Sequence, residues 1–367
     1  MNVLIVGKNG FMGFHLETYF KYHLKYNVLN FKRDDWNHLE YFIQKADLII
    51  FNSCIIRGDD ILQKNIKIID QFAKKFKETK KPVNTILISS SQREVDNEYG
   101  KSKIYAEEII GNACKDLGAN FKILVTPNIF GPFSKPNYNS AVSTFCFNLV
   151  NNYKSNVNQA EVKLVYVEDL VKFLCSPDLF EIKDQLIDVS KHIVTYKKNI
   201  QDIYGILMEI DSAFKNKNFN LNKDDLYNRL YTTYLSFINK DDFEIKHELK
   251  EDERGWLFEY NNKQDFSEKD HMFVSATMPQ KIRGNHFHFH KFEKFSFLHG
   301  KAKLKFLNLK TNEKFEFIID QSPKTFIIPP FYVHSIESLE QEKECIILFY
   351  SNEKFDGGNP DTYFLNI

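Results

Sequence analysis

The sequence has no net charge, no paired cysteines and no long apolar run, and each absence excludes a class of protein. Its 49 basic and 49 acidic residues cancel, so no overall field attracts nucleic acid or an anionic membrane. The five cysteines form no CxxC pair, which favours a cytoplasmic protein with free thiols over a disulfide-bonded secreted one. The longest apolar run, 48–56, is interrupted by Asn52 and Ser53 and is too short to span a bilayer.

What the first two-thirds of the chain does contain is an alternation of apolar strands and helical segments. The predicted strands are 3–6, 27–31, 47–51, 85–89 and 121–125, and the predicted helices are 11–22, 61–76 and 99–117. The first strand passes directly into a glycine loop without a charged region or cleavage site, so it is not expected to be a signal peptide. Strands alternating with helices predict an α/β Rossmann-like doubly wound parallel sheet, whose ligands bind beyond the carboxyl ends of the strands.

The last third has a different pattern, made of short strands separated by turns. These strands are predicted at 273–277, 295–298, 302–307, 315–319 and 346–350. Regular short strands of this kind predict a β-barrel or β-sandwich. Because a chain of 367 residues exceeds the usual size of a single core, we predict two domains, 1–242 and 243–367.

Three glycines, Gly7, Gly10 and Gly13, lie between the first predicted strand and the first predicted helix. This context suits a tight turn, a close approach of the backbone to a pyrophosphate, and anion binding at the helix N-terminus, although glycines also make ordinary turns. We therefore predict a dinucleotide site. The residues expected to contact the cofactor are Gly7, Asn9, Gly10, Phe11, Met12, Gly13, Arg33, Asp47, Ser89 and Lys103.

The end of the second predicted strand bears on which dinucleotide binds. It reads Asn-Phe-Lys-Arg (30–33), without the acidic residue that usually holds a free ribose 2′-hydroxyl. Arg33 would instead pair with a 2′-phosphate, which favours NADPH over NADH. The alternative is a solvated basic turn, because Asp34 and Asp35 follow at once.

Tyr99 and Lys103 are four residues apart in the third predicted helix and so lie on one helical face. A nearby cation is expected to lower the phenol pKa, so that the tyrosine exchanges a proton with a substrate oxygen near neutral pH. The serine run 89–91 at the end of the preceding strand would supply a hydroxyl for the same oxygen. Alone, a Tyr-x-x-x-Lys pair is common and structural; after a glycine loop and a serine run, it predicts a catalytic pair.

Near the C-terminus, His286, His288, Glu293 and His334 have the spacing of a metal site. Alternation along a strand sends His286 and His288 to the same face, and the other two can join them from neighbouring strands. Mixed nitrogen and oxygen ligands suit Zn, Fe, Mn or Ni. Such a metal would either stabilise an enolate during catalysis or only hold the β domain together.

Two further residues near this cluster have open roles. Tyr332 precedes His334 and is a candidate proton donor, or else a tyrosine packed inside the β domain. His290 alternates with the first two histidines but is extra to the pattern, so we expect it to be exposed or to neighbour the ligands. The sequence identifies no general base.

Several motifs narrow the prediction to a family. They are 127–131 (Pro-Asn-Ile-Phe-Gly), 135–140 (Lys-Pro-Asn-Tyr-Asn-Ser), 144–146 (Thr-Phe-Cys), 166–170 (Tyr-Val-Glu-Asp-Leu), 234–236 (Tyr-Leu-Ser), 252–255 (Asp-Glu-Arg-Gly) and 360–365 (Pro-Asp-Thr-Tyr-Phe-Leu). The first half resembles the extended short-chain dehydrogenase/reductases that act on nucleotide sugars. Over essentially the whole chain, the sequence resembles the two-domain capsule and O-antigen enzymes of the CapF/WbjC type.

The resemblance implies a reductase domain followed by a zinc-binding cupin domain, which is a jelly-roll barrel. It implies that the cupin domain epimerises C3 of a UDP-2-acetamido-2,6-dideoxy-4-hexulose and that the reductase domain reduces C4 with NADPH, on the route to UDP-N-acetyl-L-fucosamine. By resemblance, Tyr99 is the acid, Lys103 contacts the ribose and Ser91 bonds the keto oxygen of the substrate, and the protein is a homodimer. The residues expected to line the sugar-nucleotide side are Asn128, Asn137, Tyr138 and Asn139.

Departures from the family keep two other functions open. Val125 and Thr126 stand where relatives carry an arginine before the Pro-Asn pair, and Cys54 stands where they carry a small residue after the third strand. One alternative is an epimerase whose reductase domain is a non-catalytic scaffold. The other is a non-catalytic sensor of NADP(H) and sugar nucleotide, against which the intact Tyr99 and Lys103 argue.

Overall fold

The computed structural model describes residues 1–217, 224–247, 249–253, 255–257, 270–358 and 360–367. These residues pack into two compact units, the first made of Met1–Thr144 with Asn158–Gln201 and the second of Phe145–Val157 with Asp202–Ile367. The described residues between 202 and 242 therefore belong to the same unit as the β-rich part. The compact units thus do not divide the chain at 242/243, and that domain boundary remains a prediction. Arg254 of the motif 252–255 lies outside the described residues.

The first unit is built on a six-stranded parallel sheet in the order β2-β1-β3-β4-β5-β8. Its strands are β1 (Asn2–Val6), β2 (Asn27–Val28), β3 (Leu48–Phe51), β4 (Asn84–Ser90), β5 (Phe121–Thr126) and β8 (Leu186–Asp188). The five predicted strands are confirmed, although β2 is shorter than expected; β8 was missed because three residues are too few to show a pattern. The parallel arrangement gathers all the carboxyl ends at one edge of the sheet, where ligands bind.

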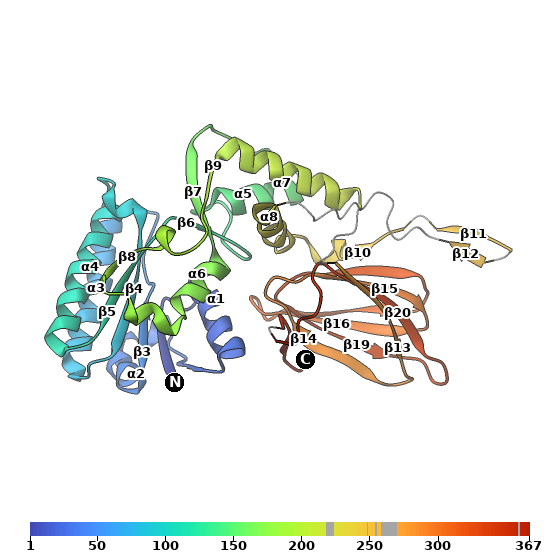
Figure 1. Cartoon of the computed structure of the whole chain (residues 1–367), viewed down its shortest axis with the longest axis horizontal. Coiled ribbons are helices and arrows are strands. Elements are labelled where there is room, and N and C mark those ends of the chain that lie inside the picture. Colours follow the sequence, from blue (N-terminus) through green and yellow to red (C-terminus); the bar gives the residue numbers. More distant parts are fainter. Residues whose placement is uncertain (218–223, 248, 254, 258–269, 359) are drawn as a thin grey trace. The chain divides into compact units, whose positions relative to one another are not determined.

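Helices cover both faces of this sheet (Figure 1). Those on one face are α2 (Leu39–Lys45), α3 (Ile61–Thr79) and α4 (Glu98–Leu117). Those on the other are α1 (Phe11–Thr18), which continues as a π-helical turn to His23, and α6 (Val167–Leu174). Residues 3–6 of β1 are completely buried between the two layers, which is why this strand is an unbroken apolar run rather than an alternating one. The predicted doubly wound fold is thereby confirmed.

A smaller sheet in the same unit was not predicted. In it β6 (Asn128–Phe130) pairs in parallel with β7 (Glu161–Tyr166), and β7 pairs antiparallel with β9 (Tyr196–Asn199). The first of these strands follows directly on β5, so the chain leaves the carboxyl edge of the main sheet through the motif 127–131. The remaining helices are α5 (Ala141–Val150), α7 (Ile200–Lys215) and α8 (Asp225–Leu235).

The second unit contains two five-stranded antiparallel sheets, in the orders β10-β18-β15-β20-β13 and β17-β16-β19-β14-β21. Their strands are β10 (Glu244–Ile245), β13 (His271–Thr277), β14 (Ile282–Phe287), β15 (Glu293–His299), β16 (Ala302–Asn308), β17 (Lys314–Ile319), β18 (Lys324–Ile328), β19 (Tyr332–Ser338), β20 (Cys345–Ser351) and β21 (Tyr363–Phe364). A separate hairpin consists of β11 (Lys250–Asp252) and β12 (Gly255–Leu257). The five predicted strands are confirmed as β13, β15, β16, β17 and β20, in the all-β architecture that a cupin jelly roll implies.

Aromatic rings fill one end of the β core. Phe243, the residue after the predicted domain boundary, is completely buried. Its ring meets those of Phe306, Phe315 and Tyr332 edge to face, with ring centres 5.3, 5.6 and 5.2 Å apart. Edge-to-face pairs add to the stabilisation that burial alone provides. Among the described residues, no helix combines the length and apolarity needed to cross a membrane.

Removing the Phe243 ring tests this cluster. Phe243→Ala should lower the free energy of unfolding of the second unit by about 3–5 kcal/mol, because a buried ring is lost and its cavity cannot collapse against three rigid neighbours. Phe355→Ala is the matched control, since Phe355 is 62% exposed. Denaturant unfolding followed by circular dichroism measures both variants, and equal losses for the two would contradict the packing described.

Candidate active site and metal centre

The glycine loop connects β1 to α1 at the carboxyl edge of the parallel sheet. Gly7 has a φ of +98°, and its carbonyl accepts a hydrogen bond from the Gly10 N–H at 3.1 Å. A Cβ atom on Gly13 would lie 2.3 Å from the Gly7 oxygen and 2.4 Å from the Lys8 oxygen. The loop thus folds tightly onto the first turn of the helix, whose N–H groups suit a pyrophosphate. Around it, Asn9 and Gly10 are exposed, Phe11 is half-buried and Met12 is buried.

A lysine that the sequence analysis missed lies between this loop and the end of β2. The Lys8 ammonium donates to Asn30 Oδ1 at 2.9 Å and is 3.4 Å from Glu17 Oε1. Asn30 is part of the 30–33 stretch, where an acidic residue would hold a ribose hydroxyl. Arg33 is exposed at the start of the following 3₁₀ turn. The only signal for Lys8 in the sequence is that it is the one cation between Gly7 and Gly10.

The side chains of two of the expected cofactor residues make other contacts. Asp47 precedes β3, and its carboxylate accepts the Asn2 N–H at 2.7 Å, so it stands at the amino-terminal edge, opposite the glycine loop. Ser89 is buried and its hydroxyl donates to Glu107 Oε1 at 2.6 Å, so its side chain faces α4. The Asp47 and Ser89 side chains are thus engaged by other groups of the protein, and their cofactor role remains a prediction.

The structure brings Tyr99, Lys103 and a serine together at the carboxyl end of β4. The Lys103 ammonium is 5.4 Å from the centre of the Tyr99 ring and donates to the Ile88 carbonyl at 3.1 Å. The serine that lies close enough to the phenol to lower its pKa is Ser90. Ser91, which the resemblance assigned to this role, is exposed at the start of the 3₁₀ turn 91–94. Ser90 also caps that turn, since its hydroxyl accepts the Gln92 N–H at 3.2 Å.

The electrostatics of this pair correct one expectation. Burial raises the pKa of Tyr99, and this effect outweighs the lowering by Lys103 and by the Ser90 hydrogen bond. The prediction of a lowered phenol pKa is therefore wrong, because it did not include desolvation. Burial opposes the charge on Lys103, but Cys54 and Tyr99 outweigh it and raise its pKa. Near neutral pH the phenol keeps its proton and the amine is an ammonium.

A bidentate ion pair holds the segment that follows Ser90. Arg93 Nε and Nη2 donate to both oxygens of the Glu107 carboxylate at 2.8–3.0 Å. Glu107 is buried in α4 and also accepts the Ser89 hydroxyl. A forked guanidinium–carboxylate contact restrains orientation as well as distance, so the turn 91–94 is fixed to the helix that carries Tyr99.

The four residues expected on the sugar-nucleotide side lie on β6 and on the turn that follows it. Asn128 is exposed, and its amide donates to the Lys163 carbonyl at 3.4 Å. Asn137 and Asn139 are exposed and Tyr138 is half-buried. Arg57, which the sequence analysis did not single out, donates to the Asn137 carbonyl at 3.3 Å and so joins the loop after β3 to this turn.

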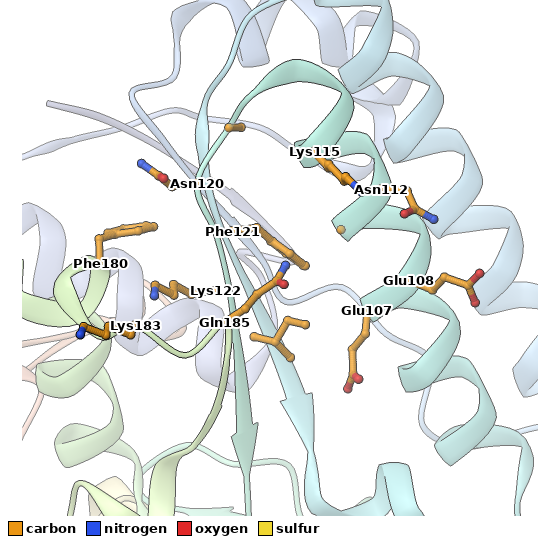
Figure 2. A pocket seen from close by; sticks show the side chains of 13 residues that line it. Glu107, Glu108, Asn112, Lys115, Asn120, Phe121, Lys122, Phe180, Lys183 and Gln185 are labelled. Atoms are coloured by element: carbon orange, nitrogen blue, oxygen red, sulfur yellow. The ribbon is translucent and has the colours of Figure 1, made fainter.

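A cavity of about 500 Å³ in the first unit shares only Glu107 with the groups described above (Figure 2). It is lined by Phe121 and Lys122 of β5, Lys115 of α4, and Gln185 before β8. Phe121 pairs with Thr85 at the start of β4, whereas Tyr99 and Lys103 lie near the end of that strand. The cavity is therefore not part of the predicted active site.

In the second unit, the four predicted metal ligands converge from both sheets. His286 lies on β14 and His288 just after it, His334 lies on β19, and Glu293 begins β15 of the other sheet. One donor atom from each lies within 4.8 Å of all the others. Glu293 Oε2 is 3.2 Å from His288 Nε2 and 3.4 Å from His334 Nε2. The strand alternation and hairpin return that the spacing predicts thus bring the four residues together.

The donor set fits a divalent transition metal ion. His334 Nε2 is buried and has no hydrogen-bond partner among the described residues, and a metal would satisfy it. Burial and the two neighbouring imidazoles lower the pKa of His286 to about 3. Burial disfavours charge on His288 and Glu293 too, but their mutual attraction outweighs it, raising the pKa of His288 and lowering that of Glu293. Three imidazoles and one carboxylate are ligands typical of zinc.

His290 and Tyr332 lie beside the four ligands but make other contacts. His290 Nε2 is 3.1 Å from the Glu353 carboxylate, and the side chain is half-buried, as expected for a neighbour of the site. The Tyr332 hydroxyl accepts a hydrogen bond from the Asn308 amide at 2.9 Å within the Phe243 cluster. Burial raises the pKa of Tyr332 to about 12. These contacts favour the packing role for Tyr332 over the proton-donor role.

Comparisons with known proteins cover both units. The NAD dependent epimerase/dehydratase family matches residues 78–176, and the polysaccharide biosynthesis C-terminal domain matches residues 250–363. The chain is 30% identical to a Pseudomonas aeruginosa protein named UDP-2-acetamido-2,6-beta-L-arabino-hexul-4-ose reductase, over 100% of this chain and 99% of the relative.

Solved structures agree with these matches. Capsular polysaccharide assembling protein CapF from Staphylococcus aureus is 27% identical, has a TM-score of 0.59 and is matched over 100% of both chains. UDP-glucuronic acid 4-epimerase from Bacillus cereus, in complex with UDP-glucuronic acid and NAD, is 18% identical with a TM-score of 0.52. That match spans 65% of this chain and 99% of the epimerase, and at this identity it shows the fold alone.

Gly13→Ala tests the glycine loop. The added methyl group would press on two backbone carbonyls, so dinucleotide affinity should fall roughly 10–100-fold, in line with the 1–3 kcal/mol that overpacking costs. The control is Gly205→Ala on α7, where a Cβ meets nothing within 4 Å. Fluorescence titration with NADPH measures both variants. Undiminished affinity in Gly13→Ala would show that the dinucleotide does not depend on this loop.

The metal centre should lose affinity as the pH falls. Ligation needs neutral imidazoles. Because the pKa of His288 is raised above its usual value of 6.5, this ring becomes protonated at a higher pH than an ordinary histidine. At pH values below the raised pKa of His288, zinc affinity should drop about tenfold per pH unit for each proton that the metal displaces. The affinity should recover as the pH rises. Chelator competition between pH 8 and pH 5 measures the effect.

Two variants control this measurement. His288→Gln should abolish tight zinc binding at every pH, whereas His299→Gln, at an exposed histidine of β15, should behave as the unmodified protein. Circular dichroism over the same pH range separates ligand protonation from unfolding. A flat affinity profile in a folded protein would contradict the assignment.

Proposed function

The chain belongs to the CapF/WbjC family of two-domain capsular polysaccharide enzymes, and from that premise we propose that it modifies a nucleotide sugar in polysaccharide biosynthesis. The proposed substrate is a UDP-2-acetamido-2,6-dideoxy-4-hexulose. The β domain epimerises its C3, and the Rossmann-like domain then reduces C4 with NADPH, on the route to UDP-N-acetyl-L-fucosamine. Support comes from the Pseudomonas aeruginosa relative, which is matched over 99% of its length and is named as a hexul-4-ose reductase.

The observation that carries the reductase half is the Tyr99–Lys103–Ser90 cluster at the carboxyl end of β4. With NADPH bound at the glycine loop 7–13, the chemistry supplied to C4 would be a hydride. The protonated Tyr99 phenol donates its proton to the C4 oxygen, so the carbonyl becomes a hydroxyl. Ser90 holds the same oxygen, and the Lys103 ammonium stabilises the phenolate that Tyr99 leaves behind.

Two cations support NADPH as the cofactor. Lys8 lies against Asn30 near the end of β2, and Arg33 follows in the next turn. A 2′-phosphate on the adenosine ribose would find positive charge in this region, whereas the acidic residue that favours NADH is missing. The tight turn at Gly7 and Gly13 gives the pyrophosphate close access to the backbone.

The four-ligand cluster supports the epimerase half. A divalent ion, proposed to be zinc, supplies Lewis-acid polarisation of a substrate carbonyl when bound. His286, His288 and His334 contribute neutral nitrogen ligands, and Glu293 contributes the one negative charge. Loss of the C3 proton and its return on the opposite face inverts that carbon. A purely structural metal is the alternative, and exchange of the C3 proton distinguishes the two.

We also propose that the protein is a homodimer, as the family resemblance implies. The edge strand β13 supports an interface, because Met272, Phe273 and Val274 are exposed on it by 40%, 39% and 62%. Contiguous apolar side chains on a strand edge invite pairing or coverage. Light scattering of the purified protein measures the mass, and a monomer at micromolar concentration would contradict this part of the proposal.

An epimerase with a non-catalytic reductase domain is the second candidate. It is favoured by Cys54, whose side chain lies close enough to Lys103 and Tyr99 to affect both of their pKa values. A thiol there occupies space where relatives have a smaller residue. The deciding experiment incubates the protein with the UDP-linked 4-keto sugar in deuterated water, with and without NADPH. Deuterium at C3 with NADPH oxidation supports both activities, deuterium alone supports the epimerase, and neither signal supports a sensor.

Tyr99→Phe separates the two activities within one chain. The variant should lose reduction by about 10²–10⁴-fold, because it removes the proton donor, while deuterium exchange at C3 continues unchanged. Tyr105→Phe on the same helix is the matched control, since that hydroxyl bonds Asp70 at the surface. NADPH absorbance and mass spectrometry of the sugar measure the two reactions. Full reductase activity in Tyr99→Phe would overturn the assignment.

A further inference from the structure

The segment 360–365 pairs with β14, the strand that carries His286 and leads directly into His288. β21 pairs antiparallel with β14, so that Phe364 lies opposite His286 and Tyr363 opposite Phe287 (Figure 1). The Leu365 N–H then donates to the Asn285 carbonyl at 2.9 Å. The C-terminal segment 360–365 therefore extends the sheet at the ligand strand, although more than 70 residues separate Asp361 from His288 in the sequence.

Asp361 in this segment binds the backbone of residues 289–291, the loop that connects His288 to Glu293. Its carboxylate is buried and accepts three successive backbone N–H groups, from Phe289 at 2.8 Å, His290 at 3.0 Å and Lys291 at 2.8 Å. Consecutive N–H groups that converge on one anion form a concave cradle for it. This cradle begins immediately after His288, so the carboxylate shapes the chain at that ligand.

The backbone of the same residue also orients His288. The Asp361 carbonyl oxygen bonds His288 Nδ1, and a carbonyl can only accept, so the proton is on Nδ1. The lone pair of the neutral ring is then on Nε2, which lies 3.2 Å from Glu293 Oε2 and inside the four-ligand cluster. One residue thus fixes both the loop after the ligand and the tautomer of the ligand itself.

We propose that Asp361 is a positioning residue that prepares His288 for the metal before the ion binds. The proposal rests on the metal site of the proposed function but concerns a residue that is not a ligand. Partners that orient ligating histidines typically contribute 10–100-fold to metal affinity. Here the carboxylate acts on the loop and the carbonyl on the ring, so a change in the side chain displaces both.

The test compares Asp361→Asn with Asp356→Asn in the full chain. The asparagine at 361 keeps the size of the side chain but replaces one acceptor oxygen with an amide that repels the N–H groups. Asp356 is exposed five residues earlier, so the same chemical change there is a matched control. Each protein is stripped of metal, and its zinc affinity is measured by chelator competition. The visible spectrum of the cobalt-loaded protein reports ligand geometry, and melting is recorded without metal.

We expect zinc affinity to fall 10–100-fold in Asp361→Asn, with an altered cobalt spectrum, and to stay unchanged in Asp356→Asn. Unchanged affinity in a folded Asp361→Asn would overturn the proposal, as would a variant that melts earlier without metal but binds zinc as before. If the unmodified protein binds no zinc, the metal site itself fails and the proposed function is what is contradicted.

Amide hydrogen exchange of the unmodified protein keeps the proposal testable if Asp361→Asn does not fold. Preorganisation requires the N–H groups of Phe289, His290 and Lys291 to be protected in the metal-free protein. Protection that appears only after zinc is added would overturn the proposal, because the metal would then order the loop rather than bind to a loop already in place.

Discussion

A buried charged side chain needs polar or oppositely charged groups in direct contact with it. This constraint organises both the Tyr99–Lys103 site and the four-residue metal cluster. Lys103 is 7% exposed and Glu293 is 8% exposed, and burial alone would neutralise each of them. Lys103 remains an ammonium because the Ile88 carbonyl, Tyr99 and Cys54 surround it. Glu293 remains a carboxylate because two imidazoles face one of its oxygens. Local compensation of this kind fixes geometry, since the partners cannot move away without exposing an unpaired charge.

The same constraint acts beside Tyr99 at the end of β4. Glu107 accepts hydrogen bonds from the Ser89 hydroxyl and the Arg93 guanidinium together, which neutralises a buried carboxylate and fixes the turn after the strand. Tyr99, Lys103 and Glu107 follow one another at four-residue intervals in α4, so they lie on one side of that helix. The structural ion pair is therefore a neighbour of the proposed catalytic pair along the same helix.

The periodicity of apolar residues made most of the fold predictable from the sequence. The spacing of His286, His288, Glu293 and His334 made the metal cluster predictable. The long apolar strands and helices of the first unit and five strands of the second follow the predicted ranges, because side-chain burial has a period that the sequence displays. What could not be predicted are pairings between distant segments, such as Asp361 with the loop after His288, and the three-residue strands β6 and β8. The raised pKa of Tyr99 depends on burial, which no spacing reveals.

The metal cluster also has an internal reason to require a cation. Three imidazoles and one carboxylate share a space in which the donor atoms are within 4.8 Å of one another. Glu293 can form an ion pair with one protonated ring, that of His288. A second proton on the cluster is disfavoured, because burial and the neighbouring imidazoles lower the pKa of His286 to about 3. His334 Nε2 is then left without a hydrogen bond among the described residues. A divalent ion at the centre would use every lone pair at once, so the residues that bind it are also the residues that its loss would leave unsatisfied.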